Sequence, residues 1–176
     1  MELTVWQHGH RPHHGLMRDG RQVIACALGR NGVTCEGREG DGATPAGLYP
    51  LRRVLYRADR MARPKGGLPA APIGLRDGWC DAPGDPAYNR PVRLPYAASA
   101  EALRRRDGLY DLVVVIGHND APPVAGLGSA IFLHVARPGL GPTLGCIALP
   151  AATLRRLVAG LGPASRIRIL PPRHAP

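Results

Sequence analysis

Two residues that could perform covalent chemistry, His134 and Cys146, lie close together in the C-terminal part of the chain. Each lies within an apolar run, and a glycine- and proline-rich segment at 137–141 separates the runs. A thiol is a strong nucleophile only as a thiolate, and a neighbouring imidazole that accepts its proton increases the thiolate fraction. Gly145 leaves space for a substrate carbonyl, and its amide can stabilise an oxyanion. The alternative is an inert core cysteine beside a core histidine.

Short strands and a turn are needed to bring the imidazole and the thiol together. Residues 131–135 are apolar, β-branched and aromatic, which predicts a buried strand. Residues 137–141 contain two glycines and a proline and should form a turn. A second apolar run begins at Cys146. We therefore expect a strand, a loop and a returning strand that place the two side chains next to each other.

The rest of the chain predicts one mainly β domain. The 176 residues include 23 glycines and 19 prolines, which favour many turns and short strands. Residues 1–176 should form a single β-sandwich-like domain with one or two short helices, and the proline-rich segment 57–95 should be a long, irregular capping loop. Further strands are expected at 3–6, 21–28, 51–56, 112–116 and 166–169, and helices at 100–106, after Ser99, and at 150–161.

The pattern of a histidine, a loop and then Thr-Leu-Gly-Cys-Ile resembles the signature of the YkuD family of L,D-transpeptidase catalytic domains. The segments Asp-Gly-Ala-Thr-Pro-Ala-Gly at 41–47 and Gly-Ser-Ala-Ile-Phe-Leu-His at 128–134 are also similar to family motifs. Members are cysteine enzymes that cut and remake peptide bonds in the stem peptides of peptidoglycan. The resemblance implies that Cys146 is the nucleophile, that His134 transfers protons, and that amides at Gly145 and Cys146 hold the oxyanion. It implies no metal and no organic cofactor.

Two positions differ from the family pattern. Leu144 stands where the family usually has a histidine, and Ala148 stands where it usually has an arginine or asparagine. The cysteine, the histidine and the glycine are present, so the resemblance supports acyl chemistry at Cys146. The group that orients the imidazole is expected to be a backbone carbonyl, which the sequence does not name.

Five residues are candidates for substrate binding. Arg137 could hold a substrate carboxylate through its planar guanidinium, or be a surface arginine at a turn. His118 and Asn119 follow a predicted strand and could reach the site; the alternative is a turn whose histidine bonds to backbone. Trp79 lies in the predicted capping loop and could cover the groove or pack against the core. Thr143, just before the Leu-Gly-Cys sequence, completes the set.

The resemblance implies that Cys146 attacks the carbonyl between the third residue of a tetrapeptide stem, diaminopimelate or lysine, and the terminal D-alanine. Water then resolves the thioester, which is L,D-carboxypeptidase action, or an amine does so, which forms 3-3 cross-links in the cell wall. We expect water and a role in muropeptide recycling, because transpeptidation needs a second peptide whose amine is uncharged. Carbapenem-type inhibitors, which mimic the end of the stem peptide, are expected to acylate Cys146.

Charge and histidine content raise two other possibilities. A net charge of +10 could indicate nucleic-acid binding, but the basic residues are dispersed and only 5% of residues are aromatic, so we expect no nucleic-acid partner. Four histidines between His8 and His14 could bind a metal, yet no cysteine or carboxylate lies among them, and we expect a solvated loop. A third possibility, an inactive protein that binds peptidoglycan fragments, is disfavoured by the intact Cys146 and His134.

The N-terminal sequence has no basic segment followed by a long apolar run, so no signal peptide is expected. No run of about 18 apolar residues predicts a membrane span. The sequence therefore predicts a cytoplasmic protein without membrane insertion, or a periplasmic one if translation starts upstream. The expected partner is a peptidoglycan stem peptide or a soluble muropeptide.

Overall fold

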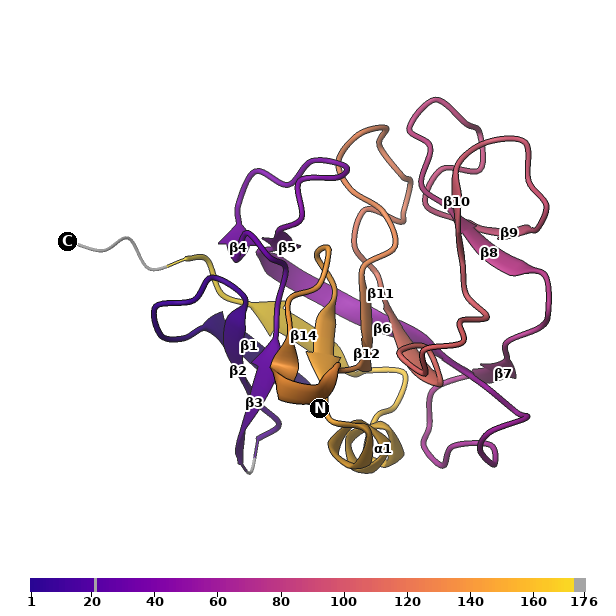
Figure 1. Cartoon of the computed structure of the whole chain (residues 1–176). Helices are drawn as coiled ribbons and strands as arrows, with labels where there is room; N and C mark the ends of the chain where they lie inside the picture. Colours follow the sequence, from indigo (N-terminus) through magenta and orange to yellow (C-terminus); the bar gives the residue numbers. More distant parts are fainter. Residues whose placement is uncertain (21, 173–176) are drawn as a thin grey trace.

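A computed structural model describes residues 1–20 and 22–172. These residues form a nine-stranded sheet, a three-stranded sheet, a two-stranded sheet, one α-helix and one 3-10 helix (Figure 1). The elements are β1 (Glu2–Gln7), β2 (His14–Arg18), β3 (Val23–Ala27), β4 (Val33–Thr34), β5 (Thr44–Pro45), β6 (Gly47–Tyr56), β7 (Ala70–Pro72), β8 (Asp77–Cys80), β9 (Pro91–Arg93), β10 (Ala100–Ala102), β11 (Leu112–Ile116), β12 (Phe132–Val135), η1 (Pro138–Leu140), β13 (Ile147–Leu149), α1 (Ala151–Ala159) and β14 (Arg166–Ile169). The mainly β fold predicted from composition is confirmed.

The large sheet closes on itself through its longest strand. Its strand order is β11-β12-β13-β3-β2-β1-β14-β6-β7, and β6 pairs with β11 as well as with β14. The first half of β6 lies antiparallel to β14 and the second half antiparallel to β11. The closed sheet encloses a large core of apolar side chains, which α1 shares.

The β11 strand separates this large core from a smaller one. Leu112, Val114 and Ile116 belong to the large core, whereas Val113 and Val115 belong to the small core on the opposite face. Because both faces are covered, the strand is apolar at every position. This continuous run is the feature that predicted the strand from the sequence.

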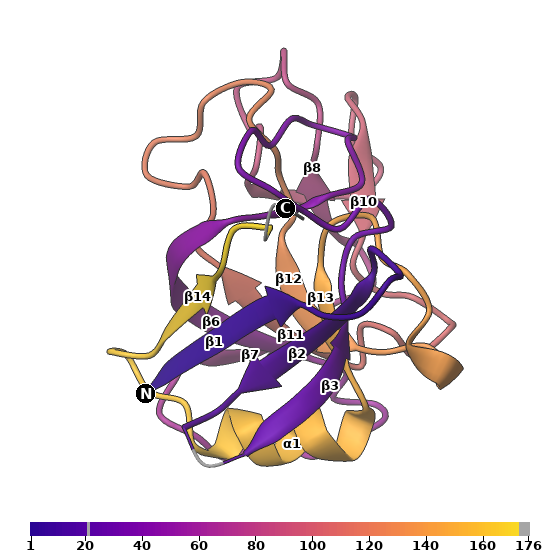
Figure 2. The same cartoon turned by 90° about the vertical axis from the view of Figure 1, so that its left-hand side faces the viewer.

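The helix α1 corresponds to the helix that the sequence predicts at 150–161. Leu154, Leu157 and Val158 are buried along one face, at the spacing of an amphipathic helix. Pro150 precedes the first turn, and the Gly160 N–H donates to the Leu157 carbonyl at the C-terminus. Figure 2 shows the helix lying across the lower end of the large sheet, beneath β3.

The helix predicted at 100–106 is wrong. Ala100–Ala102 is instead the strand β10, which pairs antiparallel with β8 through Ala100 and Cys80 and through Ala102 and Gly78. The helical preference of this alanine-rich segment is weak compared with the backbone and side-chain contacts that β8 provides. That partner lies far away in the sequence, so a local pattern does not reveal it.

The segment 57–95 is also more ordered than predicted. It contains β7, which extends the large sheet beside β6, and β8 and β9, which form the three-stranded sheet with β10. Figure 1 shows this small sheet on the far side of β11 and β12 from β1, β2 and β3. Likewise, the expected loop around the N-terminal histidines ends early, because His14 is the first residue of β2.

Candidate active site

The strands β12 and β13 hold the histidine and the cysteine on one face of the large sheet. They are parallel neighbours, with His134 paired to Ala148, because the segment 136–146 carries the chain back to the start of β12 before β13 begins. Side chains alternate between the two faces of a strand, so His134 shares a face with Cys146 and Ala148. This is the face that carries the small core.

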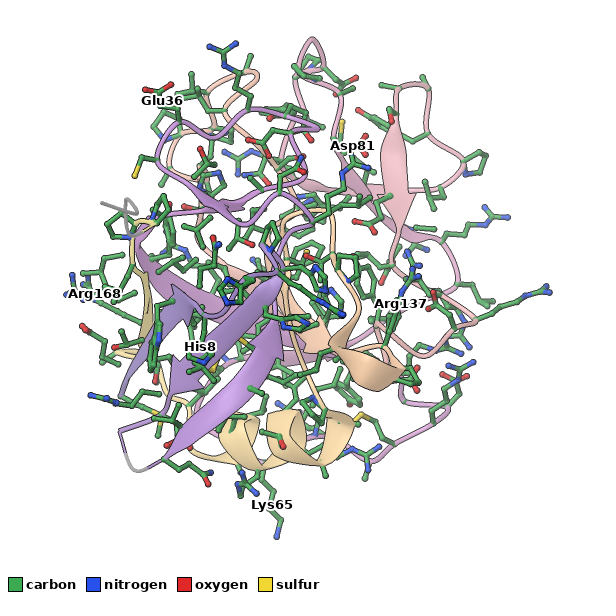
Figure 3. All side chains as sticks on the ribbon, turned by 60° about the vertical axis from the view of Figure 1, so that its left-hand side comes forward. His8, Glu36, Lys65, Asp81, Arg137 and Arg168 are labelled. Carbon is green, nitrogen blue, oxygen red and sulfur yellow. The ribbon has the colours of Figure 1, made fainter. Side chains whose placement is uncertain are left out.

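A cavity of about 660 Å³ opens on this face. Cys146, His134 and Ala148 line it from the two strands, and Tyr110 lines it from the segment before β11. Arg137 and Asp81, both labelled in Figure 3, belong to its walls, Asp81 from the end of β8. The large sheet therefore supplies the thiol and the imidazole, and the three-stranded sheet supplies an opposing wall.

The thiol of Cys146 is held away from solvent by the backbone. Only 8% of the residue is exposed. Its Sγ donates to the Ala130 carbonyl at 3.2 Å and accepts a hydrogen bond from the Phe132 N–H at 3.3 Å. Burial, helped by the negative charge of Glu101, raises the pKa of Cys146 to about 12. The resting side chain is therefore a neutral thiol.

The imidazole of His134 is buried as well, with 6% of the residue exposed. Burial lowers its pKa to about 4, so the resting ring is neutral. Its Nδ1 lies 2.8 Å from the Val135 carbonyl oxygen. A neutral ring that donates from Nδ1 to this carbonyl has its lone pair on Nε2, which is the arrangement of a general base. A backbone carbonyl thus orients the ring, as the sequence analysis expected.

The turn that carries Cys146 depends on Thr143 and Gly145. Gly145 has a φ of +131°, and a Cβ there would lie 2.9 Å from the Ala43 carbonyl oxygen, so glycine is required. The Thr143 hydroxyl donates to the Cys146 carbonyl at 2.6 Å and accepts from the Gly145 N–H at 3.2 Å. The Thr143 N–H in turn donates to the Leu28 carbonyl next to β3. These bonds fix the peptide that presents the thiol.

A family model described as the L,D-transpeptidase catalytic domain, YkuD, matches residues 8–169. The chain belongs to the YkuD family. Searches among curated proteins and among solved structures returned no significant match. The YkuD assignment makes the protein a cysteine enzyme of the L,D-transpeptidase type that acts on peptidoglycan.

At two positions that line the cavity, this YkuD domain differs from the family pattern. Ala148, in register with His134, is 1% exposed and presents only a methyl group where the family usually has an arginine or asparagine. Leu144, in place of the usual histidine, is 77% exposed at the cavity. The cavity therefore lacks a charged or amide group at the first position and has an apolar rim at the second.

Of the five candidate binding residues, the structure brings Arg137 and Thr143 to the cavity. The other three lie elsewhere. Trp79 is buried in the small core, where its indole N–H donates to the Asn89 side chain at 2.9 Å. The His118 Nε2 lies 3.0 Å from the Leu127 carbonyl, and the Asn119 side chain bonds to backbone at Val124 and Gly128. The contacts of His118 and Asn119 therefore stabilise the loop before β12.

Sequence reasoning missed the charged residues on the opposing wall. Asp81, Glu101 and Arg105 line the cavity together with Tyr110. Glu101 lies in the segment that was predicted to be a helix, and none of these residues forms a recognisable motif with Cys146. The pairing of β8 with β10 brings Asp81 and Glu101 to this wall, and contacts of the segment that follows β10 bring Arg105 and Tyr110 there.

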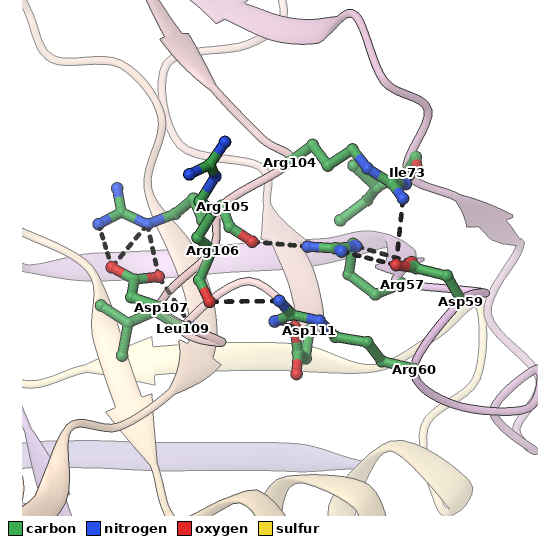
Figure 4. Close-up of polar contacts among 10 residues, drawn as sticks. All are labelled: Arg57, Asp59, Arg60, Ile73, Arg104, Arg105, Arg106, Asp107, Leu109 and Asp111. Carbon is green, nitrogen blue, oxygen red and sulfur yellow. Dashed lines mark hydrogen bonds and ion pairs between the residues drawn. The ribbon is translucent and has the colours of Figure 1, made fainter.

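A network of arginines fixes the segment that carries Arg105 and Tyr110 (Figure 4). Arg57, just after β6, donates to the Arg105 carbonyl and to the Asp59 carboxylate. Arg60 donates to the Arg106 carbonyl and to the Asp111 carboxylate. The backbone of this segment is thus anchored beside the large sheet, while the side chains of Arg105 and Tyr110 line the cavity.

Other sites have little support in the described ranges 1–20 and 22–172. No group of three or more potential ligands there could hold a metal ion. The rings of His13 and His14 meet edge to face, with centroids 4.6 Å apart. No helix within those ranges is both long enough and apolar enough to cross a bilayer.

Proposed function

We propose that the protein is an L,D-carboxypeptidase that removes the terminal D-alanine from the tetrapeptide stems of soluble muropeptides. The observation that carries the proposal is the meeting of Cys146 and His134 on one wall of a single cavity, with the imidazole Nδ1 bonded to the Val135 carbonyl. The cavity volume of about 660 Å³ falls within the range of small-ligand sites, so it can take the end of a peptide.

The proposed reaction has two halves. Cys146 Sγ attacks the carbonyl carbon of the third stem residue while its proton passes to His134 Nε2. The amide bond then breaks, the imidazolium protonates the amine of the leaving D-alanine, and a thioester remains on Cys146. A water molecule gives a proton to Nε2 and its oxygen to the acyl carbon, and the thiol is restored. Backbone amides of the turn at Gly145 and Cys146 are the proposed oxyanion donors.

Two features favour water over an amine in the second half. The small Ala148, which lines the cavity, removes a family group that could have held a second peptide. An attacking peptide amine must also first lose the proton that it carries at neutral pH, because an ammonium group has no lone pair with which to attack a thioester. Water needs neither that prior deprotonation nor a groove for a second peptide.

The test is incubation of the purified protein with a free disaccharide-tetrapeptide in water enriched in oxygen-18, followed by mass analysis. The proposal predicts a tripeptide product that carries one heavy oxygen in its new carboxylate. Cross-linked dimers as the main product would show that an amine resolves the thioester and would favour the alternative, 3-3 cross-linking of the cell wall.

The cytoplasmic location predicted from the sequence is part of this proposal, because soluble muropeptides are the substrates that a cytoplasmic enzyme would meet. Cell fractionation with an antibody against the native protein checks it. Recovery of the protein with the periplasm or the cell wall would contradict a recycling role, even if the purified protein hydrolyses muropeptides.

A further inference from the structure

A tyrosine and a carboxylate, neither part of the proposed mechanism, line the same cavity as the thiol. Tyr110 is 5% exposed and belongs to the same small core as Cys146. Its ring meets the His134 ring edge-on, with centroids 5.2 Å apart. Its hydroxyl donates to Glu101 Oε1 at 2.7 Å. Tyr110 therefore connects the carboxylate on β10 to the two reacting side chains.

The surroundings of the Glu101 carboxyl group shift its pKa in opposing directions. Burial raises its pKa, and the negative charges of Asp81 and Asp107 act in the same direction. The hydrogen bond from Tyr110 and the positive charge of Arg105 act against this rise. The Arg105 guanidinium lies 3.5 Å from Glu101 Oε1 and 5.1 Å from the centroid of the Tyr110 ring. The protonated form of Glu101 is therefore more accessible than that of an exposed carboxyl group.

The two neighbours act on the thiol in opposite directions. The charge of Glu101 raises the pKa of Cys146, whereas donation by the Tyr110 hydroxyl, which lines the same cavity, would lower it. A phenol has one proton to donate. The Tyr110 hydroxyl can therefore stabilise the Glu101 carboxylate or the Cys146 thiolate, but not both at once.

We propose that Glu101 and Tyr110 are positioning residues that control the proton of the Cys146 thiol. When Glu101 is ionised, the Tyr110 hydroxyl donates to it and the thiol keeps its proton. When Glu101 takes a proton from solvent in the cavity, its own O–H donates to the Tyr110 oxygen, and the Tyr110 O–H turns to the thiolate. The thiol proton passes to His134 Nε2. This inference rests on the proposed role of Cys146 as the nucleophile.

The chain contains a matched control for this pair. The Tyr88 hydroxyl donates to Glu39 Oε2 at 2.6 Å, and Glu39 borders the same cavity. Tyr88 is as buried as Tyr110, with 4% exposed. Its neighbours include Gly128 and Ser129. Tyr88→Phe therefore removes the same hydroxyl from a buried tyrosine–glutamate pair beside the site.

The test is the rate at which iodoacetamide alkylates Cys146, followed by peptide mass spectrometry between about pH 6 and pH 10. Tyr110→Phe should slow alkylation about tenfold, equivalent to a rise of about one pKa unit, because the thiolate loses the donor that it gains when Glu101 is protonated. Glu101→Gln should speed it about threefold or more, because it removes the opposing charge. Tyr88→Phe should leave it unchanged. The exposed Cys35 provides an internal standard in every variant.

Opposite effects in Glu101→Gln and Tyr110→Phe, with thermal unfolding near that of the wild type, would support the inference, since a loss of packing would change both in the same direction. Changes of the same sign, or no change in either variant, would overturn it. The measurement uses no stem peptide. If the two variants change alkylation as predicted but the protein does not cleave muropeptides, the proposed function alone is rejected. If the protein cleaves muropeptides but neither variant changes alkylation, this inference alone is rejected.

Discussion

At the scale of single residues, the proposed catalytic pair, Cys146 and His134, rests as a neutral thiol and a neutral imidazole. Burial raises the pKa of Cys146 to about 12 and lowers that of His134 to about 4. Both shifts disfavour the charged forms, so a preformed thiolate–imidazolium pair is not the resting state. In the structure the thiol is bonded to the Ala130 carbonyl. A buried, protonated thiol is less susceptible to oxidation than an exposed thiolate.

The buried histidine makes the fold sensitive to acid. The pKa of His134 is about 4 in the folded state and near its ordinary value of 6.5 in the unfolded state. Between these values the unfolded chain binds the proton more readily, so this contribution to stability is complete above about pH 6.5 and is lost as the pH falls. Its full size is roughly 3 kcal/mol, because each pKa unit corresponds to about 1.4 kcal/mol.

Urea unfolding at about pH 7 and about pH 4.5 checks this prediction. The wild type should lose more stability between these conditions than His134→Gln, whose amide does not titrate. His10→Gln, which changes an exposed histidine, should behave like the wild type. An equal loss in the wild type and His134→Gln would show that His134 is not held neutral by burial.

At the scale of elements, the parallel pair β12 and β13 places the thiol, and the turn before β13 holds it there. The Thr143 hydroxyl joins the Gly145 N–H to the Cys146 carbonyl. Thr143→Val should therefore cost about 1–3 kcal/mol of stability, because two backbone groups lose their partner, and it should also lower activity. Thr143→Ser keeps the hydroxyl and should stay near the wild type in both. Thermal unfolding and muropeptide turnover of the two variants check this prediction. Equal stability and equal turnover of Thr143→Val and Thr143→Ser would contradict this role of the hydroxyl.

Several elements could be predicted because their evidence is local. The continuous apolar run predicts β11, the spacing of Leu154, Leu157 and Val158 predicts α1, and the alternation of Ile167 and Ile169 with arginines predicts β14. Cys146 and His134 could be singled out because their types and motif are distinctive.

The opposing wall of the cavity could not be predicted in this way. Glu101 faces the cavity because β10 pairs with β8, and Tyr110 because Arg57 and Arg60 anchor the backbone around it. These contacts join segments that are distant in the sequence, and periodicity or local propensity does not encode them.

At the scale of the whole molecule, two sheets enclose one site. The closed large sheet provides a rigid face for the thiol and imidazole, and the three-stranded sheet covers that face from the other side. All four cysteines are free, and Cys26 and Cys80 are buried without a histidine in a matching motif. Covalent reactivity toward substrates should therefore be confined to Cys146.

Acylation by a carbapenem checks this selectivity. Intact-mass analysis and peptide mapping should find a single drug adduct on Cys146, because a site that takes the stem terminus should also take an acyl donor that mimics it. The adduct should persist in Cys35→Ser and disappear in Cys146→Ala. An adduct that survives Cys146→Ala, or that maps to Cys35, would contradict a specific acyl-donor pocket at Cys146.

The most direct test of the account is the turnover of a purified disaccharide-tetrapeptide by the wild type and by Cys146→Ala, with D-alanine and tripeptide measured by mass spectrometry. We expect equal amounts of the two products from the wild type. Cys146→Ala should unfold at the wild-type temperature and release the products at least roughly a thousandfold more slowly, which is the loss expected when a covalent nucleophile is removed. Residual turnover within about tenfold of the wild type would show that Cys146 is not the nucleophile.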